Sequence, residues 1–196
     1  AQYRFGSASG LFDGTGDTLQ MTADSRFALG TAWTAEGWFR QSSSPANGHQ
    51  AVYYQGDDDY VFYARASGST NDGVFFYFNG TAIRGTTDLA DDTWHHFAMV
   101  RDGSTARAFI DGTSVGTASP TWVAASTSDK VHIGAQNSSN YFKGHIDEVR
   151  VTTGLARYTG NFTAPSAAFT DPATANHFTK TGTITATNDS PTNGDA

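Results

Sequence analysis

Two adjacent carboxylates, Asp147 and Glu148, lie in the segment GHIDEVRV at residues 144–151, which is otherwise largely apolar. Such a pair could act as acid and base in glycoside hydrolysis, bind a metal ion or serve a structural role. Retaining glycosidases need two carboxyl groups about 5–5.5 Å apart on one side of the scissile bond. In a strand this requires a spacing of two, because successive side chains point to opposite faces. Adjacent acids do not meet that requirement, so the pattern disfavours glycosidase chemistry.

The same alternation places Asp147 on a face with Val149 and Val151, which predicts that it points into the protein interior. A buried ionised carboxylate is costly unless it pairs with a cation or binds a metal ion. Glu148 and Arg150 share the opposite face, where we expect them to form an ordinary surface ion pair. The metal and structural roles of Asp147 both remain open at this point.

Other residues with chemical potential are more scattered. His95 and His96 are adjacent, so they face opposite ways in a strand and cannot chelate one ion together. Three acids, Asp57, Asp58 and Asp59, form a loop between two aromatic strands. We interpret this loop as a solvated acidic turn, with a cation site as the alternative.

The elements that would position these residues are short strands. Runs of aromatic and β-branched residues recur between Gly, Asn, Asp and Ser, which predicts strands at 17–22, 33–41, 50–55, 60–66, 73–79, 93–102, 106–112, 130–136 and 141–151. Asn79-Gly80 and Asp111-Gly112 suit tight hairpin turns. We expect a helical turn only at residues 154–160, because no window of 12 or more residues carries the 3.6-residue apolar period. We therefore predict an all-β fold, with antiparallel strands in two packed sheets.

Composition excludes several classes of partner. The net charge of −7 and the sequence pI near 5.1 disfavour nucleic acids and anionic membrane surfaces. No apolar run reaches the roughly 20 residues of a membrane span. The chain has no cysteine, so disulfides and thiolate chemistry are excluded. It opens at Ala1 with no signal peptide, and we expect it to be a piece of a longer protein.

The chain of 196 residues is long enough for one sizeable β domain, and we expect this domain at residues 1–170. Residues 171–196 are polar and rich in Thr. We expect the second segment to be a terminal arm or a linker, with the start of a further module as the alternative. Aromatic residues crowd the strands at 50–55, 60–66 and 73–79, and most of them must lie in the core. Among them, we expect Tyr54, Tyr63 and Tyr77 to be exposed and able to stack on sugar rings, because their hydroxyls favour contact with water.

Three blocks, in order, carry a family resemblance: LFDGTGDTLQM with TAEGWFR (11–21 and 34–40), TWHHFAMVRDGSTARAFIDGTSVGTA (93–118) and GHIDEVRVTTGLARYTGNFTAP (144–165). Together they resemble the laminin G-like domains of the concanavalin A-like lectin/glucanase superfamily, over about residues 5–170. The resemblance is to the bacterial and phage type of these domains, and the ending ARYTGNFTAP of the third block is most similar to domains of marine phage structural proteins. The resemblance implies a jelly-roll sandwich of two curved sheets, of which the concave one often meets glycans.

The resemblance also implies where a metal ion would bind. In related jelly rolls a structural calcium often lies where the first and last strands meet, so Asp13 and Asp147 are candidate ligands, with carbonyl groups from Gly14 or Thr15. The alternative is that Asp13 makes an Asx turn and that Asp147 caps backbone N–H groups or pairs with a base. By the same resemblance, Asp57, Asp58 and Asp59 could hold a second calcium that bridges to sugar hydroxyls.

These observations predict a non-catalytic module that recognises a glycan or polysaccharide, stabilised by calcium and located outside the cell, on a cell surface or on a virion. It would belong to a larger assembly. The alternative is a structural decoration, fibre or adhesion module that acts through contacts with other protein subunits. A glycoside hydrolase of the same fold ranks third, because of the carboxylate spacing.

Overall fold

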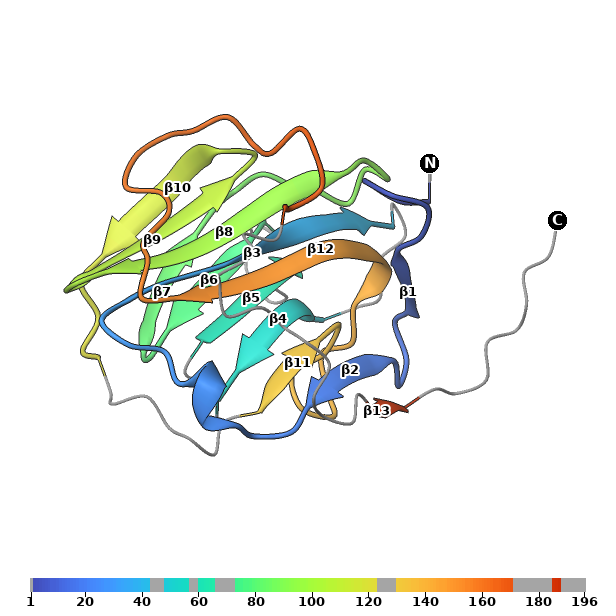
Figure 1. Cartoon of the computed structure of the whole chain (residues 1–196). Helices are drawn as coiled ribbons and strands as arrows, with labels where there is room; N and C mark the ends of the chain where they lie inside the picture. The colour runs from blue at the N-terminus through green and yellow to red at the C-terminus, as the bar shows by residue number, and fades with distance from the viewer. Residues whose placement is uncertain are drawn as a thin grey trace, which may run out of the picture.

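The computed structural model describes residues 2–42, 48–56, 60–65, 73–122, 130–170 and 185–187. Within these residues, thirteen strands form one six-stranded and one seven-stranded sheet, and every neighbouring pair is antiparallel. The two sheets face each other as a jelly-roll sandwich (Figure 1). This confirms the all-β, two-sheet prediction.

The six-stranded sheet, called sheet A, has the order β1 (Gly10–Asp13), β12 (Lys143–Thr153), β3 (Ala32–Gln41), β8 (His95–Asp102), β9 (Thr105–Ile110) and β10 (Thr113–Ala118). The seven-stranded sheet, called sheet B, has the order β13 (Thr185–Thr187), β2 (Thr18–Met21), β11 (Val131–Ile133), β4 (Gln50–Gln55), β5 (Tyr60–Arg65), β6 (Phe75–Phe78) and β7 (Thr81–Arg84). A short 3-10 helix, η1 (Ser25–Phe27), follows β2. Among the described residues, no helix is both long and apolar enough to cross a membrane.

The main core between the sheets is built on aromatic rings. Phe62 of β5 stacks on Phe97 of β8 and on Phe76 of β6, each with ring centroids 4.6 Å apart. Trp33 and Phe39 of β3 are fully buried in the same core. Aromatic pairs in such contacts contribute beyond the area that they bury. The crowding of aromatic residues in the sequence is therefore mainly a property of the core.

Strand β8 is buried on both of its faces. Phe97 and Met99 enter the main core, whereas Ala98 and Val100 point the other way and join a smaller cluster with Phe109. A segment at residues 154–170, called the strap, covers this outer face of sheet A over β8 and β9 (Figure 1). The helical turn expected at residues 154–160 is wrong: the strap contains no helix and is held by side-chain contacts to the sheet.

The two predicted hairpin turns are confirmed. Asn79 and Gly80 have φ of 36° and 80°, and Asp111 and Gly112 have φ of 50° and 78°, as a primed two-residue turn requires. Beyond the expected domain end at residue 170, Thr185–Thr187 form β13 against β2. The other residues of the expected arm at 171–196 lie outside the described residues.

Candidate functional site

A β-bulge in β12 changes the orientation of the acidic pair. Asp147 is opposite Trp38 and Arg150 is opposite Glu36, so Glu148 and Val149 together face the single residue between them on β3. Glu148 has a φ of 51°, which fits a bulged residue. The strict alternation used to place these side chains is therefore wrong here. Asp147 points to the outer face of sheet A, and Val149 packs against the main core.

The carboxylate of Asp147 accepts hydrogen bonds from three backbone N–H groups. Its Oδ2 accepts the N–H groups of Arg4 at 2.8 Å and Phe5 at 3.2 Å, and its Oδ1 accepts the N–H of Glu148 at 2.9 Å. Phe5 and Arg4 also pack on the ring of Trp38, the cross-strand neighbour of Asp147. Asp147 thus fastens the N-terminal segment to sheet A, which is the capping alternative that the sequence left open.

The expected surface pair of Glu148 and Arg150 does not form. Glu148 Oε2 instead accepts the N–H of Phe169 in the strap at 2.7 Å. The guanidinium of Arg150 donates from Nε and Nη2 to Glu36 Oε1 at 3.0 and 2.7 Å, and it lies over the ring of Phe169. The bulge is the reason, because it aligns Arg150 with Glu36 across the strand pair.

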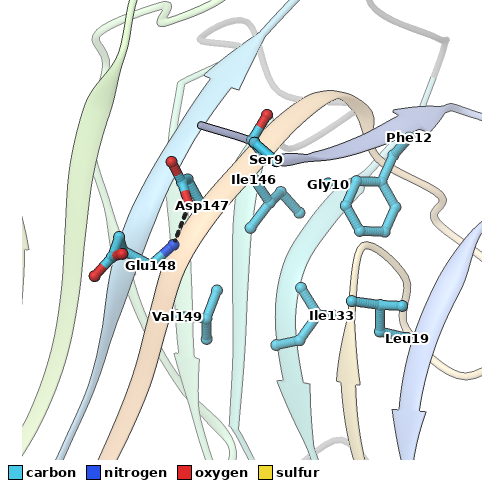
Figure 2. Close-up of a pocket in the computed structure, with 10 residues that line it drawn as sticks. Ser9, Gly10, Phe12, Leu19, Ile133, Ile146, Asp147, Glu148 and Val149 are labelled. Atoms are coloured by element: carbon cyan, nitrogen blue, oxygen red, sulfur yellow. Dashed lines mark hydrogen bonds between the residues drawn. The ribbon is translucent and has the colours of Figure 1, made fainter. Parts of the chain in front are cut away.

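Asp147 and Glu148 also border a cavity of about 340 Å³, which lies between β1 and β12 of sheet A and β2 and β11 of sheet B (Figure 2). Its wall is apolar and comes from both sheets, with Ile146 and Val149 on β12, Ile133 on β11 and Leu19 on β2. Figure 2 shows the two carboxylates directed away from this apolar wall. The two acids thus have separate backbone partners: Arg4, Phe5 and Glu148 for Asp147, and Phe169 for Glu148.

The carboxylates of Asp13 and Asp147 do not meet. Asp13 is opposite Lys143, four residues from Asp147 along β12, which separates the two backbone positions by roughly 13 Å. Asp13 Oδ1 accepts the N–H and the hydroxyl of Thr15 at 2.6 and 2.9 Å, as in an Asx turn. Among the described residues there is no cluster of three or more acidic or His side chains suited to a metal ion. A calcium ion shared by Asp13 and Asp147 does not fit this arrangement; calcium binding by Asp13 with carbonyls of Gly14 or Thr15 stays a prediction.

Glu36 is the most deeply buried acid in the described chain, at 0% exposure on the outer face of sheet A. Besides Arg150, its partners are the hydroxyl of Tyr158, which donates to Oε2 at 2.8 Å, His96, whose Nε2 lies 3.3 Å from Oε2, and Arg157, whose Nε lies 3.6 Å from Oε1. Burial alone raises the pKa of Glu36, but His96, Arg150 and Tyr158 outweigh it and hold the pKa below its ordinary value. Burial and the adjacent Glu36 raise the pKa of Tyr158.

The tyrosines expected to be exposed are placed differently. Tyr54 and Tyr63 are 1% and 6% exposed, so the expectation of exposure is wrong for both; Tyr77 is half-buried. Their hydroxyls find partners inside the protein: Tyr63 donates to Gln136 Oε1 at 2.5 Å, and Tyr54 accepts from Asn137 Nδ2 at 3.2 Å. The loop with Asp57, Asp58 and Asp59 lies outside the described residues.

A group of side chains that the sequence did not single out meets at one end of sheet A. Trp94, directly before β8, and His145 on β12 have ring centroids 6.3 Å apart. Arg40 on β3 donates from Nε to the carbonyl of Asp92 at 2.6 Å, and both residues act electrostatically on His145. Burial and the charge of Arg40 lower the pKa of His145. These four residues, called the Trp94 rim, join an aromatic surface to donors and acceptors.

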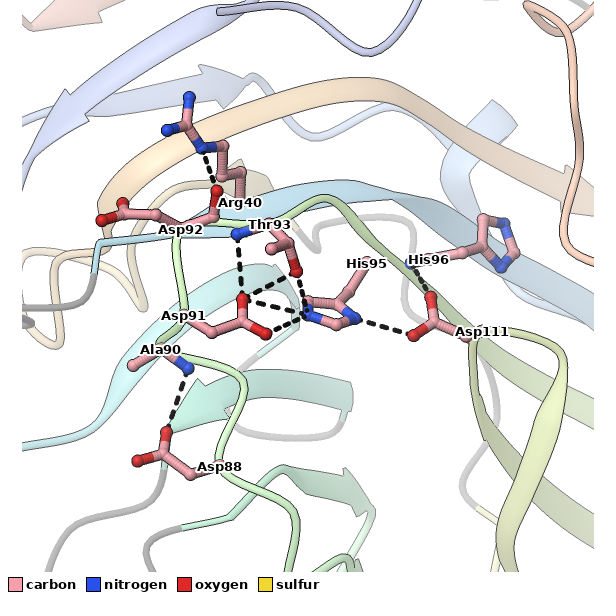
Figure 3. A network of polar contacts seen from close by, with 9 residues as sticks. All are labelled: Arg40, Asp88, Ala90, Asp91, Asp92, Thr93, His95, His96 and Asp111. Carbon is pink, nitrogen blue, oxygen red and sulfur yellow. Dashed lines mark hydrogen bonds and ion pairs between the residues drawn. The ribbon is translucent and has the colours of Figure 1, made fainter. Parts of the chain in front are cut away.

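Next to this rim, His95 lies between two carboxylates (Figure 3). Its Nδ1 is 2.7 Å from Asp111 Oδ2, and its Nε2 is 3.3 Å from both oxygens of Asp91. His96 is on the other face, beside Glu36, so the expectation that the two histidines face opposite ways is confirmed. The sequence could have indicated the Trp94 rim only through the strand register, which places Arg40 opposite His145.

Comparison with known families identifies the fold. A laminin G profile of the concanavalin A-like lectin/glucanases superfamily matches residues 13–155. The chain belongs to this superfamily. Among curated proteins, no sequence matches the chain. The superfamily contains both binding modules and enzymes, so the family alone does not decide the activity.

Several solved structures resemble the chain in fold at low sequence identity. The fourth domain of AbnA, an extracellular arabinanase of Geobacillus stearothermophilus solved with arabinotriose, has a TM-score of 0.59 and 14% identity over 76% of this chain and 71% of its own. A candidate carbohydrate-binding protein of Bacteroides ovatus has a TM-score of 0.62 and 16% identity over 76% of this chain and 44% of its own. The NanB sialidase of Streptococcus pneumoniae has a TM-score of 0.57 and 14% identity, over 81% of this chain and 27% of its own. The chain thus spans less than half of the last two proteins, and these likenesses establish the fold only.

Proposed function

We propose that this domain is a non-catalytic module that binds carbohydrate, and that it acts outside the cell as part of a larger surface or virion protein. The non-catalytic part of the proposal is supported by the acids on β3 and β12, whose carboxylates are all engaged in hydrogen bonds or ion pairs within the protein. Asp147 accepts hydrogen bonds from three backbone N–H groups, and Glu148 accepts one. Glu36 is buried against the guanidinium of Arg150 and the hydroxyl of Tyr158. None of these arrangements supplies an acid poised beside a base on an open surface.

The choice of carbohydrate is supported by the fold neighbours. One of them is a domain of about the same extent that was solved with arabinotriose, and another is a candidate carbohydrate-binding protein. The acidic charge of the chain, −7 in total, fits a neutral or hydroxyl-rich ligand better than a polyanion. These points favour a sugar over a nucleic acid or an anionic lipid surface.

We place the ligand at the Trp94 rim rather than on a sheet face. The strap covers the outer face of sheet A over β8 and β9. On sheet B, two of the three tyrosines expected to contact sugars, Tyr54 and Tyr63, are buried, and Tyr77 is half-buried. Trp94 is half-buried and is flanked by Arg40, Asp92 and His145, which supply a guanidinium, a carboxylate and an imidazole. Sites for small polar ligands commonly combine an aromatic surface with a few fixed polar groups.

A glycan array probed with the full chain, followed by calorimetric titration of the best ligand, tests the proposal. We expect saturable binding to a defined oligosaccharide without release of shorter sugars. Titration with added calcium and again after EDTA tests whether an ion contributes, as predicted for Asp13. Failure to bind any glycan would overturn the carbohydrate proposal, and release of reducing sugar would overturn the non-catalytic one.

A second function is favoured by one observation. Leu11 on β1 and Leu19 on β2 are 69% and 38% exposed, and Leu19 borders the apolar cavity of Figure 2. Exposed apolar side chains beside a cavity suit contact with another protein subunit. If sedimentation shows a stable oligomer that Leu11→Ser dissociates, and the array shows no ligand, the structural role replaces the carbohydrate proposal.

A further inference from the structure

His95 connects three separate parts of the chain at the end of sheet A. It begins β8, it contacts Asp91 in the loop at residues 88–93, and it contacts Asp111 in the turn between β9 and β10 (Figure 3). The imidazole is 13% exposed, whereas the two carboxylates are 48% and 43% exposed. These three residues, Asp91, His95 and Asp111, are called the clamp. In the clamp, a largely buried imidazole ring lies between two solvent-exposed carboxylates.

Each ring nitrogen of His95 faces a carboxylate, so hydrogen bonds to both acids need two N–H donors on one imidazole. Nδ1 faces Asp111 and Nε2 faces Asp91, and a carboxylate can only accept a hydrogen bond. A neutral histidine carries one N–H, so it can satisfy only one of the two acids. Both contacts can be hydrogen bonds only when the ring is an imidazolium.

The two contacts are unequal, and the difference decides which is lost first. The contact to Asp111 is 2.7 Å, and Asp111 is also fixed by the N–H of His96, which donates to its Oδ1 at 2.8 Å. The contacts to Asp91 are longer, at 3.3 Å, and Asp91 belongs to the loop. Loss of one proton should therefore leave Nδ1–H on Asp111 and turn the lone pair of Nε2 toward Asp91.

Thr93 extends this effect into the loop. Its hydroxyl donates to Asp91 Oδ1 at 2.8 Å and lies 2.9 Å from Nε2 of His95. Beside a neutral ring, the hydroxyl can donate to Nε2 only by leaving Asp91. Asp91 would then lose the hydrogen bond from His95 and the one from Thr93 together, and would keep the N–H of Thr93 at 2.9 Å.

We propose that the clamp of Asp91, His95 and Asp111 is a proton-dependent fastening of the loop at residues 88–93, closed with an imidazolium and loosened with a neutral ring. Within the part of the chain that the structure describes, Asp111 and Asp91 are the charged groups that act on the ring. Phe39 of β3 packs against it, and Arg40 donates to the carbonyl of Asp92 (Figure 3). His96 faces the opposite side of the sheet, and Asp88 accepts the N–H of Ala90 within the loop.

The electrostatics agree with this direction. Burial lowers the pKa of His95, but Asp111 and Asp91 outweigh it, so the pKa lies above its ordinary value of 6.5. The clamp therefore contributes its full stabilisation below pH 6.5, and that contribution is lost as the pH rises through the raised pKa. If the Trp94 rim binds ligand as proposed above, its affinity should fall over the same pH interval, because Asp92 belongs to the loop; this consequence alone depends on the proposed function.

The test is an NMR titration of the free protein, following the imidazole of His95 and the amides of Ala90, Asp91 and Thr93. We expect His95 to titrate with a midpoint above that of an unperturbed histidine, and the loop amides to shift and exchange faster with the same midpoint. Asp91→Asn should lower the midpoint of His95 and keep the fold. His95→Gln should abolish the loop titration, whereas His49→Gln, at a half-buried histidine directly before β4 of sheet B, should not.

Two results would overturn the proposal. One is a midpoint for His95 at or below the ordinary value, which would show that the two acids do not hold the second proton. The other is a set of loop amides that stay unchanged while His95 titrates, which would show that the proton does not control the loop. No ligand is needed, so neither result depends on whether the domain binds carbohydrate.

Discussion

The hydroxyl of Tyr158 donates to Glu36 Oε2 at 2.8 Å, and this bond joins the strap to a carboxylate with 0% exposure. Arg150 contacts the other oxygen of Glu36 from β12. An ionised acid without water must be satisfied by such donors, and the loss of one partner from a buried pair is costly. The same group of contacts therefore holds the strap against the outer face of sheet A.

Tyr158→Phe should destabilise the domain by about 1.5–3 kcal/mol, the usual cost of losing a hydrogen bond to a charged group. The ring remains to stack on Phe162, so the variant removes only the hydroxyl. Urea unfolding measures the change in the free energy of unfolding. Tyr3→Phe, at an exposed tyrosine, is the matched control and should leave it unchanged. An equal response of the two variants would contradict the role given to Tyr158.

Glu36 should make the stability sensitive to acid. Its pKa is lowered from 4.5, so its contribution is present above the pKa of the unfolded chain and is lost as the pH falls through the lower folded value. Glu36→Gln should cost about 3–5 kcal/mol at pH 7 because Arg150 and Arg157 lose their anion. The free energy of unfolding of this variant should also fall less steeply than that of the wild type below pH 4.5.

The sequence predicted those parts of the fold that depend on local pattern. The strand predicted at residues 93–102 is β8, and Asn79-Gly80 and Asp111-Gly112 correctly indicated tight turns. Strands β7 and β10, which follow these two turns, were missed because their residues are small or polar and carry little apolar pattern. Such strands are defined mainly by the neighbours with which they pair.

The candidate site could be predicted less well, because it depends on departures from the pattern. One extra residue in β12 reverses the faces after Asp147, and no feature of GHIDEVRV indicates that bulge. Tyr54 and Tyr63 are buried against partners far away in the sequence, Asn137 and Gln136. Local hydrophobicity does not contain this information. Hydrogen-bond partners, rather than the spacing of the carboxylates, therefore indicate what Asp147 and Glu148 do.

Gly112 should be far less tolerant of substitution than Gly103, although both lie in turns with a positive φ. A Cβ on Gly112 would lie 2.0 Å from the carbonyl oxygen of Phe162 in the strap, whereas a Cβ on Gly103 would meet nothing within 4 Å. Gly103→Ala should cost about 1–2 kcal/mol from the backbone alone. Gly112→Ala should cost more and should accelerate amide exchange at Phe162, whose N–H donates to the Gly112 carbonyl. Similar exchange in both variants would show that the strap does not depend on this turn.

Asp147→Ala should release the N-terminal segment without affecting ligand binding. The change leaves the N–H groups of Arg4, Phe5 and Glu148 without their acceptor, at a cost of about 1–3 kcal/mol. Amide exchange at Arg4 and Phe5 should rise, and urea unfolding should show the loss. Asp13→Ala is the comparison, since it removes only a local Asx turn. If added calcium stabilises the wild type and Asp147→Ala removes that effect, the structural role of Asp147 is incomplete.

Trp94→Ala should weaken binding of the glycan found on the array by about tenfold or more, the effect typical of a central aromatic contact. Arg40→Ala should weaken it less, because the side chain supplies a polar contact beside the ring and also supports the Asp92 carbonyl. Calorimetric titration measures both affinities. Leu155→Ala, at an exposed residue that follows β12 at the opposite end of sheet A, is the control and should bind like the wild type. If Trp94→Ala folds normally and binds with unchanged affinity, the ligand does not contact the Trp94 rim, and the cavity beside Leu19 becomes the next surface to test.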